Sequence, residues 1–228
     1  MINKGMRNMF SVAIDGPSGA GKSSVSKAVC NAVGFRHIDT GAMYRALGYA
    51  AVKSGVDVSD EAEVQAMLDK LDVNVKFDDE GQKVFVNGED VTGKIRTEQI
   101  SAMASDISKL PCVRAFLLGL QRKTAEEYNV IMDGRDIGTV VLPDAQLKIY
   151  LTASVEKRAE RRYQELLAKN ENVEYNKVLE NAIIRDKQDM ERKTAPLRPA
   201  DDAVIVDTTD MSFDESVKMI TKLIKERM

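Results

Sequence analysis

Residues 16–23 (Gly-Pro-Ser-Gly-Ala-Gly-Lys-Ser) constrain the fold most, because they fit the pattern G-x-x-x-x-G-K-[ST] between an apolar run and a helical segment. The glycines let the backbone turn tightly and point successive N–H groups at phosphate oxygens, and the positive end of the following helix faces the same anion. Lys22 supplies a positive charge for the β and γ phosphates, and the Ser23 hydroxyl suits a Mg²⁺ ion, mostly through water. The run predicts a strand, a loop and a helix that bind a nucleoside triphosphate with Mg²⁺.

This loop leaves two points open. Ser24 lies next to Ser23 and could take over its Mg²⁺ role, although we rank Ser23 first. Switches, motors and kinases all use such loops, so the acceptor has to be identified elsewhere in the chain. The alternative, a glycine-rich turn with a solvated lysine, is disfavoured by the strand and helix on either side. The loop residues assigned to ATP are Gly16, Ser18, Gly19, Ala20, Gly21, Lys22, Ser23 and Ser24.

Short β-rich apolar runs alternate with longer segments of helical periodicity. Strands are expected at residues 9–14, 35–38, 130–132, 147–151 and 203–206, and helices include 23–33, 42–53 and 113–127. Near-continuous apolar strands are typical of a parallel sheet that is buried on both faces, with helices in its right-handed crossovers. We therefore predict an α/β fold of the P-loop NTPase type, with a parallel five-stranded sheet flanked by helices.

Two stretches interrupt this rhythm. Residues 73–77 and 83–86 alternate with period two across an Asp-Asp-Glu-Gly turn, and a short run follows Asn87-Gly88, which predicts a small antiparallel insert. The segment 154–193 is more charged than its surroundings and should project from the core as a helical lid. We expect one domain over 1–228, with a core at about 1–40, 110–153 and 195–228, an acceptor-binding region with the insert at about 41–109, and the lid at about 154–193.

Composition disfavours several functions. With 43% hydrophobic and 30% charged residues and a net charge of −3, the chain has an ordinary globular composition and lacks the basic excess of a nucleic-acid binder. No apolar run approaches the roughly eighteen residues that span a bilayer, and the start lacks a secretory signal. The sequence has two cysteines, Cys30 and Cys112, both in helical patterns, so a reducing cytoplasm is the expected location. We also expect the protein to be a monomer. His37, the only histidine, lacks a Cys or His partner for zinc and is interpreted as structural.

Arginines recur in segments that could receive a second anion. An acceptor monophosphate is a dianion, and the planar guanidinium groups of Arg45, Arg114 and Arg135 suit its oxygens. Any one of these arginines alone would more often be a solvated surface residue. Arg185, Asp189 and Arg192 fall at i, i+4 and i+7, so they share a helical face that either addresses one ligand or forms a surface ion-pair ladder.

Arg158, Arg161 and Arg162 share another face of the lid, beside several glutamates. They either reach the triphosphate or belong to a solvated helix of mixed charge. Clustered like charges repel one another, so we expect the lid to carry its arginines into the active site only when ligand is present. We also expect Arg192 to be an exposed lid residue, whose replacement by alanine leaves thermal stability almost unchanged.

Three runs carry a family resemblance. Ile-Asp-Gly-Pro-Ser-Gly-Ala-Gly-Lys at 14–22, Asp-Thr-Gly-Ala-Met-Tyr-Arg at 39–45 and Asp-Gly-Arg-Asp-Ile-Gly-Thr at 133–139 resemble the bacterial cytidylate kinases. The insert and the late arginine run before Ala-Pro-Leu extend the resemblance nearly end to end. It implies phosphorylation of CMP and dCMP by MgATP, which supplies pyrimidine nucleotides. Small molecules are then the partners, with no role for a nucleic acid or a membrane.

The resemblance also implies roles for single residues. Arg45, Arg135 and Arg192 would face the acceptor phosphate, and Arg185 and Asp189 would contact the ribose. Arg158 and Arg161 would complete the ATP set. The residues implied as catalytic are Lys22, Arg135, Arg158, Arg162 and Arg192.

Recognition of the base needs a different chemistry. Cytosine presents an amine donor beside two acceptors, which a carboxylate and a guanidinium complement, and Asp136 and Arg114 supply this pair. The resemblance places both at the base together with Ser105, and it places Thr40 where the family usually has serine. Uracil would leave polar groups mismatched at about 1 to 3 kcal/mol each, so UMP should be the poorer substrate.

No nucleophilic triad or metal cluster is visible, and none is needed, because an acceptor phosphate is already ionised. Catalysis then consists of alignment and charge neutralisation. A kinase for another small acceptor, such as adenylate, thymidylate or shikimate, is disfavoured by the Asp-Gly-Arg-Asp run and the insert. A nucleotide switch would need an Asn-Lys-x-Asp run, which the sequence lacks.

Overall fold

The computed structural model describes residues 9–228, so the first eight residues of the expected core lie outside the described part. A five-stranded parallel sheet forms its centre, in the strand order β2-β6-β1-β7-β8. These strands are β1 (Ser11–Asp15), β2 (Arg36–Asp39), β6 (Val130–Gly134), β7 (Leu147–Thr152) and β8 (Val204–Asp207). Every bound lies within two residues of its predicted position, which confirms the predicted sheet.

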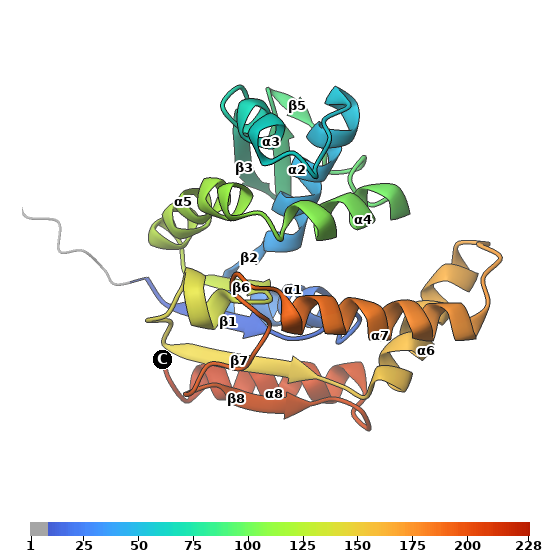
Figure 1. The fold of residues 1–228 in the computed structure, drawn as a ribbon. Helices are drawn as coiled ribbons and strands as arrows, with labels where there is room; N and C mark the ends of the chain where they lie inside the picture. The colour runs from blue at the N-terminus through green and yellow to red at the C-terminus, as the bar shows by residue number, and fades with distance from the viewer. Residues whose placement is uncertain (1–8) are drawn as a thin grey trace, which may run out of the picture.

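Helices cover both faces of this sheet because its strands are apolar on both sides (Figure 1). Val12 and Ile14 of β1 pack on one side with α1 (Lys22–Val33) and α8 (Phe213–Lys225). Ala13 points to the opposite side and joins the largest core cluster, which includes α2 (Thr40–Ser54) and α5 (Pro111–Glu127). Alternate residues of one strand thus build two cores.

The region that the sequence predicts to bind the acceptor lies above the sheet in Figure 1 and carries the predicted insert. A three-stranded antiparallel sheet consists of β3 (Val73–Asp78), β4 (Gly81–Val86) and β5 (Glu89–Asp90). The helices α3 (Glu61–Leu68) and α4 (Glu98–Ile107) complete the region. The side chain of Gln82 on β4 hydrogen-bonds both the N–H and the C=O of Asp39, so the insert is tied to the end of β2.

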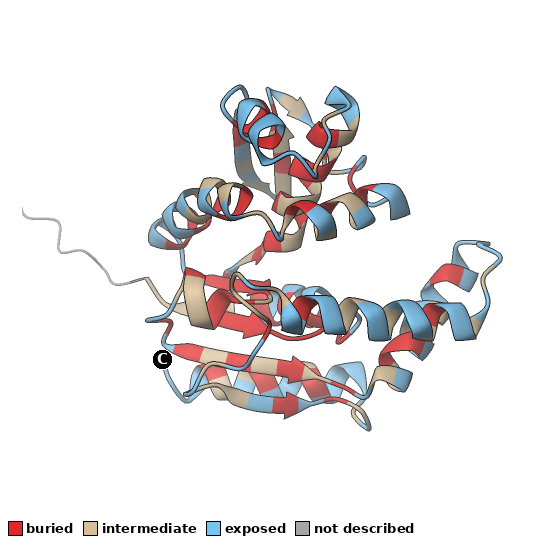
Figure 2. Cartoon of the chain, in the orientation of Figure 1, coloured by how far each residue is buried: buried red, intermediate tan, exposed pale blue. Residues whose placement is uncertain are grey.

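The charged segment forms a pair of helices, α6 (Val155–Ala168) and α7 (Tyr175–Glu191), that projects from the sheet as predicted (Figure 1). The pair has a small apolar cluster of its own around Ala159, Leu166 and Val178. Figure 2 shows that burial concentrates on the central strands, whereas the outer faces of α6 and α7 are exposed. Within residues 9–228 no helix combines the length and the apolarity needed to cross a membrane.

One element was not anticipated. A π-helical turn, η1 (Ile137–Val141), follows β6 directly. The carboxylate of Asp15, at the end of β1, accepts hydrogen bonds from the backbone N–H groups of Ile137 (2.8 Å) and Gly138 (2.7 Å). Burial raises the pKa of Asp15 to about 6. This carboxyl group therefore fixes the segment that contains Arg135 and Asp136 to the strand that precedes the phosphate-binding loop.

Candidate active site

The phosphate-binding loop connects β1 to α1 at the carboxyl edge of the sheet. A Cβ on Gly16 would lie 1.9 Å from the carbonyl oxygen of Leu151, so the neighbouring strand leaves room for glycine alone. Gly21 has a left-handed backbone (φ 86°) and caps α1 without a side-chain hydrogen bond. The first N–H groups of α1 therefore keep their capacity to bind an anion.

Lys22 lies buried inside this loop. Its Nζ donates hydrogen bonds to the carbonyl oxygens of Gly16 and Pro17, both at 2.7 Å. Burial lowers the pKa of Lys22 well below its ordinary value, and the nearby charge of Arg135 lowers it further. The lysine charge is therefore held in place and is electrostatically costly, as suits a group that meets a polyanion.

The hydroxyl of Ser23 donates to Asp133 Oδ2 at 2.8 Å, and His37 Nε2 lies 2.5 Å from Asp133 Oδ1. Burial would raise the pKa of Asp133, but the hydrogen bond and charge of His37 outweigh it and hold that pKa below its usual range. We did not assign Asp133 a role from the sequence. Its signal was a carboxylate directly after the apolar strand 130–132. Among the described residues Ser24 makes no such contact, which favours Ser23.

Arg45 stands at the start of the acceptor region. It donates to Asp39 Oδ2 at 2.8 Å, and the other oxygen of Asp39 caps α2 through the N–H of Ala42. The Nε of Arg45 is buried without a hydrogen-bond partner in residues 9–228. One donor of this guanidinium is thus available to a ligand.

Arg135, directly after β6, meets Arg185 and Asp189 of α7. Arg135 Nε donates to Asp189 Oδ2 at 2.7 Å, and the charge of Asp189 outweighs burial and raises the pKa of Arg135. The Nε of Arg185 is buried and finds no partner within the described chain. Burial lowers the pKa of Arg185, and the charges of Arg135 and Arg45 act in the same direction. The arginines that the resemblance assigned to phosphate and ribose therefore form one cationic cluster.

Asp136 joins the two arginines expected near the base and the phosphate. It forms a buried ion pair with Arg114, whose guanidinium lies 5.8 Å from the ring centre of Tyr44. Arg192 NH2 reaches the other oxygen of Asp136 at 3.4 Å, and Arg192 Nε donates to the carbonyl of Ala195 at 2.6 Å. The pairing of Asp136 with Arg114 agrees with the predicted base-recognition pair, although it does not test that role.

The expectation that Arg192 is an exposed lid residue is wrong. Its side chain is only 6% exposed, and its backbone (φ −61°, ψ 139°) lies just beyond the end of α7. Arg192 lies outside the helix, so the helical face inferred from the spacing does not extend to it, and periodicity does not reveal that the chain after α7 folds back onto Asp136. Its replacement by alanine would therefore remove buried contacts.

Thr40 and Ser105 differ in how they relate to this cluster. Thr40 is buried, and its hydroxyl donates to the backbone carbonyl of Asp133 at 2.7 Å. Ser105 lies half-buried on α4, and no hydrogen bond joins its side chain to Arg114 or Asp136 in the described residues. Arg114 instead donates to the carbonyl of Ser108, one turn further along.

The three lid arginines separate in space. Arg158 donates to the carbonyl of Ser18 at 3.0 Å and forms a bidentate pair with Asp186, so it already contacts the phosphate-binding loop. Arg161 donates to the carbonyl of Thr208 at 2.7 Å. Arg162 is 48% exposed and pairs with Glu165, and its charge acts on Arg185. Their shared helical face therefore does not bring them to one place, and lid movement stays a prediction.

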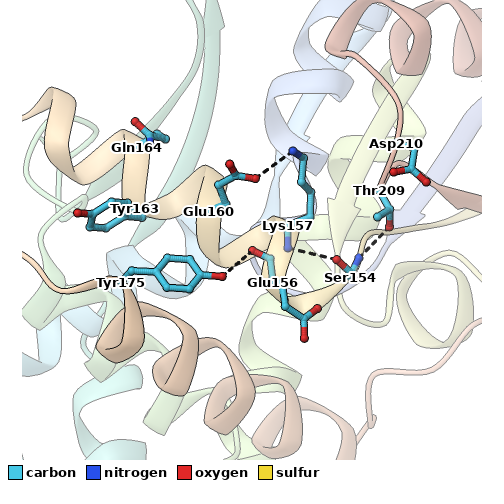
Figure 3. Close-up of a pocket in the computed structure, with 9 residues that line it drawn as sticks. All are labelled: Ser154, Glu156, Lys157, Glu160, Tyr163, Gln164, Tyr175, Thr209 and Asp210. Carbon is cyan, nitrogen blue, oxygen red and sulfur yellow. Dashed lines mark hydrogen bonds and ion pairs between the residues drawn. The ribbon is translucent and has the colours of Figure 1, made fainter.

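A surface pocket of about 490 Å³ lies beside α6 and is separate from this site (Figure 3). None of the predicted site residues lines it. Its polar groups pair with one another, as the contacts of Lys157 with Glu160 and of Tyr175 with the Glu156 carbonyl show. The pocket therefore brings no additional group to the cationic cluster.

Comparisons with known proteins give one consistent result. The sequence model of the family described as cytidylate kinase matches residues 12–226. A cytidylate kinase of Caldicellulosiruptor bescii is 47% identical over 94% of this chain and 95% of its own length. One from Bacillus subtilis is 46% identical over 97% and 99%. A crystal structure of an uncharacterized protein from Eubacterium ventriosum shares the fold, with a TM-score of 0.51 and 13% identity over 96% of this chain and all of its own.

Proposed function

The chain belongs to the cytidylate kinase family, and from this premise we propose how its residues divide the work of transferring a phosphoryl group from ATP to CMP or dCMP. The reaction yields CDP and dCDP and so supplies pyrimidine nucleotides. One observation carries the assignment of residues. Arg135 acts on Lys22 through its charge, and Arg45 and Arg185 each present a buried Nε that has no hydrogen-bond partner within residues 9–228. Such a cluster is electrostatically favourable only when anions lie among the cations.

The donor side binds ATP through the loop and the lid. The backbone of residues 16–24 and Lys22 hold the phosphates, and Arg158 and Arg161 approach from α6. Ser23 and Asp133 fit Mg²⁺, because a hydroxyl and a carboxylate 2.8 Å apart are the oxygen donors that this ion takes in related loops. An ion held there would neutralise part of the charge of the triphosphate. Ser23 is the preferred ligand, mostly through water.

The acceptor side binds the monophosphate. Arg45, Arg135 and Arg192 bind its phosphate, and Arg185 and Asp189 bind its ribose. Asp136 and Arg114 read the base edge, with contributions from Ser105 and Thr40. The pairs between these carboxylates and arginines hold each group in position while the site is free of nucleotide. Binding energy then goes into alignment and not into ordering loose side chains.

Catalysis requires no general base, because the attacking phosphate oxygen is already ionised at neutral pH. The groups that stabilise the charge of the transferring phosphoryl are Lys22, Arg135, Arg158, Arg162 and Arg192. Preorganised cations of this kind contribute more in the transition state than in the ground state. Arg162 is 48% exposed and pairs with Glu165, so its part depends on its release from that pair.

Movement of the lid can be tested by hydrogen exchange over residues 154–193, with and without a bisubstrate analogue. We expect slower exchange in α6 and α7 when the analogue is bound, because the arginines then gain an anionic partner. The amides of β1 and β6 serve as the internal control, since they lie in the rigid sheet. Equal protection of the lid in both states would show that it does not close.

We propose that residues 1–40, 110–153 and 195–228 form the core, 41–109 the acceptor region and 154–193 the lid. We further propose that the protein works as a monomer in the cytoplasm, with ATP and pyrimidine monophosphates as its partners. Both cysteines are free thiols, which is consistent with a reducing compartment.

The direct test is ADP release with MgATP and a panel of nucleoside monophosphates. CMP and dCMP should be phosphorylated, while AMP, GMP and dTMP should be slower by at least roughly a hundredfold, because they leave buried polar groups unmatched. UMP should fall between these groups. Asp136→Asn provides the control, since an amide no longer distinguishes the cytosine and uracil edges. Comparable rates on AMP would contradict the assigned acceptor site.

A further inference from the structure

The only histidine of the chain lies at the edge of the donor site and takes no part in the mechanism above. His37 is on β2, next to β6, and its side chain is 16% exposed. Its Nε2 contacts Asp133 Oδ1 at 2.5 Å, and Ser23 donates its hydroxyl hydrogen to Oδ2 of the same carboxylate at 2.8 Å. His37, Asp133 and Ser23 thus form a continuous hydrogen-bonded chain.

The two partners of Asp133 fix its orientation. Asp133 is buried, so water does not replace a lost partner, and each of its oxygens has one hydrogen-bond donor. Lys22 also acts on this carboxylate through its charge. Without His37 the carboxylate could rotate toward Lys22, and the hydrogen bond from Ser23 would then lose its geometry.

The direction of the Ser23 hydroxyl matters for binding a cation. A hydroxyl has one hydrogen and two lone pairs. Because Asp133 accepts the hydrogen, the lone pairs of Ser23 are left for a ligand on its other side. A freely rotating hydroxyl would present its hydrogen to the cation part of the time and bind it less well.

We propose that His37 is a positioning residue of the donor site, which holds the Asp133 carboxylate so that Ser23 presents its lone pairs to the metal bound with ATP. This role rests on the assignment of Mg²⁺ to Ser23 and Asp133 proposed above. His37 does not touch the nucleotide and acts through Asp133 alone. Partners of metal ligands in this position are typically worth about 10- to 100-fold in metal affinity or activity.

The experiment compares His37→Leu, which removes the donor, with His37→Gln, whose amide N–H₂ can reach the place of the imidazole Nε2. ATP affinity is measured by calorimetry with Mg²⁺ and with EDTA, and KM for MgATP, KM for CMP and kcat are measured in parallel. We expect His37→Leu to reduce the gain in ATP affinity that Mg²⁺ provides by about tenfold or more. The affinity in EDTA and KM for CMP should stay unchanged, and His37→Gln should recover most of the loss.

Two reference variants separate this inference from its premise. Ser23→Ala and Asp133→Asn should both weaken Mg²⁺-dependent binding of ATP. If neither does, the metal assignment fails and the inference fails with it. If both do and His37→Leu does not, only the role of His37 is overturned. A thermal unfolding temperature that falls equally in His37→Leu and His37→Gln, with no change in the Mg²⁺-dependent gain, would leave His37 as a packing residue and also overturn the inference.

Discussion

The donor loop and the acceptor cluster both hold buried cations, but their partners lie at different distances along the chain. Lys22 is held by carbonyls five and six residues away, within its own loop. Arg135 pairs with Asp189 across 54 residues, and Arg192 pairs with Asp136 across 56. The loop therefore holds its lysine locally, whereas the arginine pairs of the acceptor cluster require α7 and the chain after it to dock on the core.

The two sites also differ in whether their buried hydrogen-bond donors find acceptors within the described part of the protein. The ammonium of Lys22 has two carbonyl acceptors, while Arg45 and Arg185 each keep a buried Nε without a partner in residues 9–228. Ligand binding should therefore stabilise the acceptor side more than the donor loop, because it supplies partners that this side lacks. Four predictions test this contrast.

The largest effect should come from Lys22→Met, which removes the donor-side charge and keeps most of the side-chain volume. Turnover should fall by about 10²- to 10³-fold, as expected for one preorganised charge at the transferring group. Thermal stability should stay equal or increase, because burial and Arg135 already disfavour the lysine charge. Steady-state kinetics and thermal unfolding measure both. Near-normal turnover would remove Lys22 from the mechanism.

Asp15 joins the end of β1 to the turn η1 that follows β6. Its raised pKa makes the stability of the folded protein depend on pH. The carboxyl group favours its neutral form in the folded protein, so its contribution to stability is present below its ordinary pKa of 3.8 and is lost as pH rises through about 6. The loss is up to about 3 kcal/mol. Asp15→Asn should abolish this dependence.

The measurement for Asp15 is urea unfolding of both proteins at several pH values across that window. The difference in unfolding free energy between the parent protein and Asp15→Asn isolates this one group, because all other titrating groups are shared. A difference that stays constant from pH 3.8 to about 6 would show that Asp15 is ionised throughout.

Arg192→Ala should lower CMP turnover strongly and, contrary to the expectation from the sequence, also lower stability by about 1 to 2 kcal/mol. The alanine leaves the Ala195 carbonyl without its donor and vacates buried space. Chemical denaturation and kinetics with saturating ATP check the two effects. An unchanged unfolding free energy would mean that Arg192 is as weakly held as a surface side chain.

Arg185→Met should give the smallest effect on the free energy of unfolding. It should raise this free energy, whereas Arg192→Ala lowers it. Its Nε has no partner to lose within the described residues, and burial and Arg135 disfavour its charge. We expect the unfolding free energy to rise by about 1 kcal/mol while KM for CMP increases. Destabilisation by this variant would show that the guanidinium is satisfied in solution and would break the contrast with Arg192.

The sequence alone determined the local parts of this protein. Glycines at 16, 19 and 21 and the following Lys22 specify a phosphate-binding loop, because backbone conformation and the N-terminus of a helix act within a few residues. The strand and helix bounds followed from periodicity to within two residues. The motifs that contain the arginines also identified the family, whose model matches residues 12–226, while the roles of the single arginines stay predictions.

Only the tertiary structure decided which carboxylate meets which cation. The strand order β2-β6-β1-β7-β8 places Asp133 beside Asp39 and opposite the loop after β1, so that Asp133 contacts both His37 and Ser23. Chain folding after α7 buries Arg192, which helical spacing alone had left exposed. Periodicity reports the face on which a residue lies but not the segment that covers that face. Partners far apart in the sequence are therefore fixed only when the sheet and its crossovers assemble.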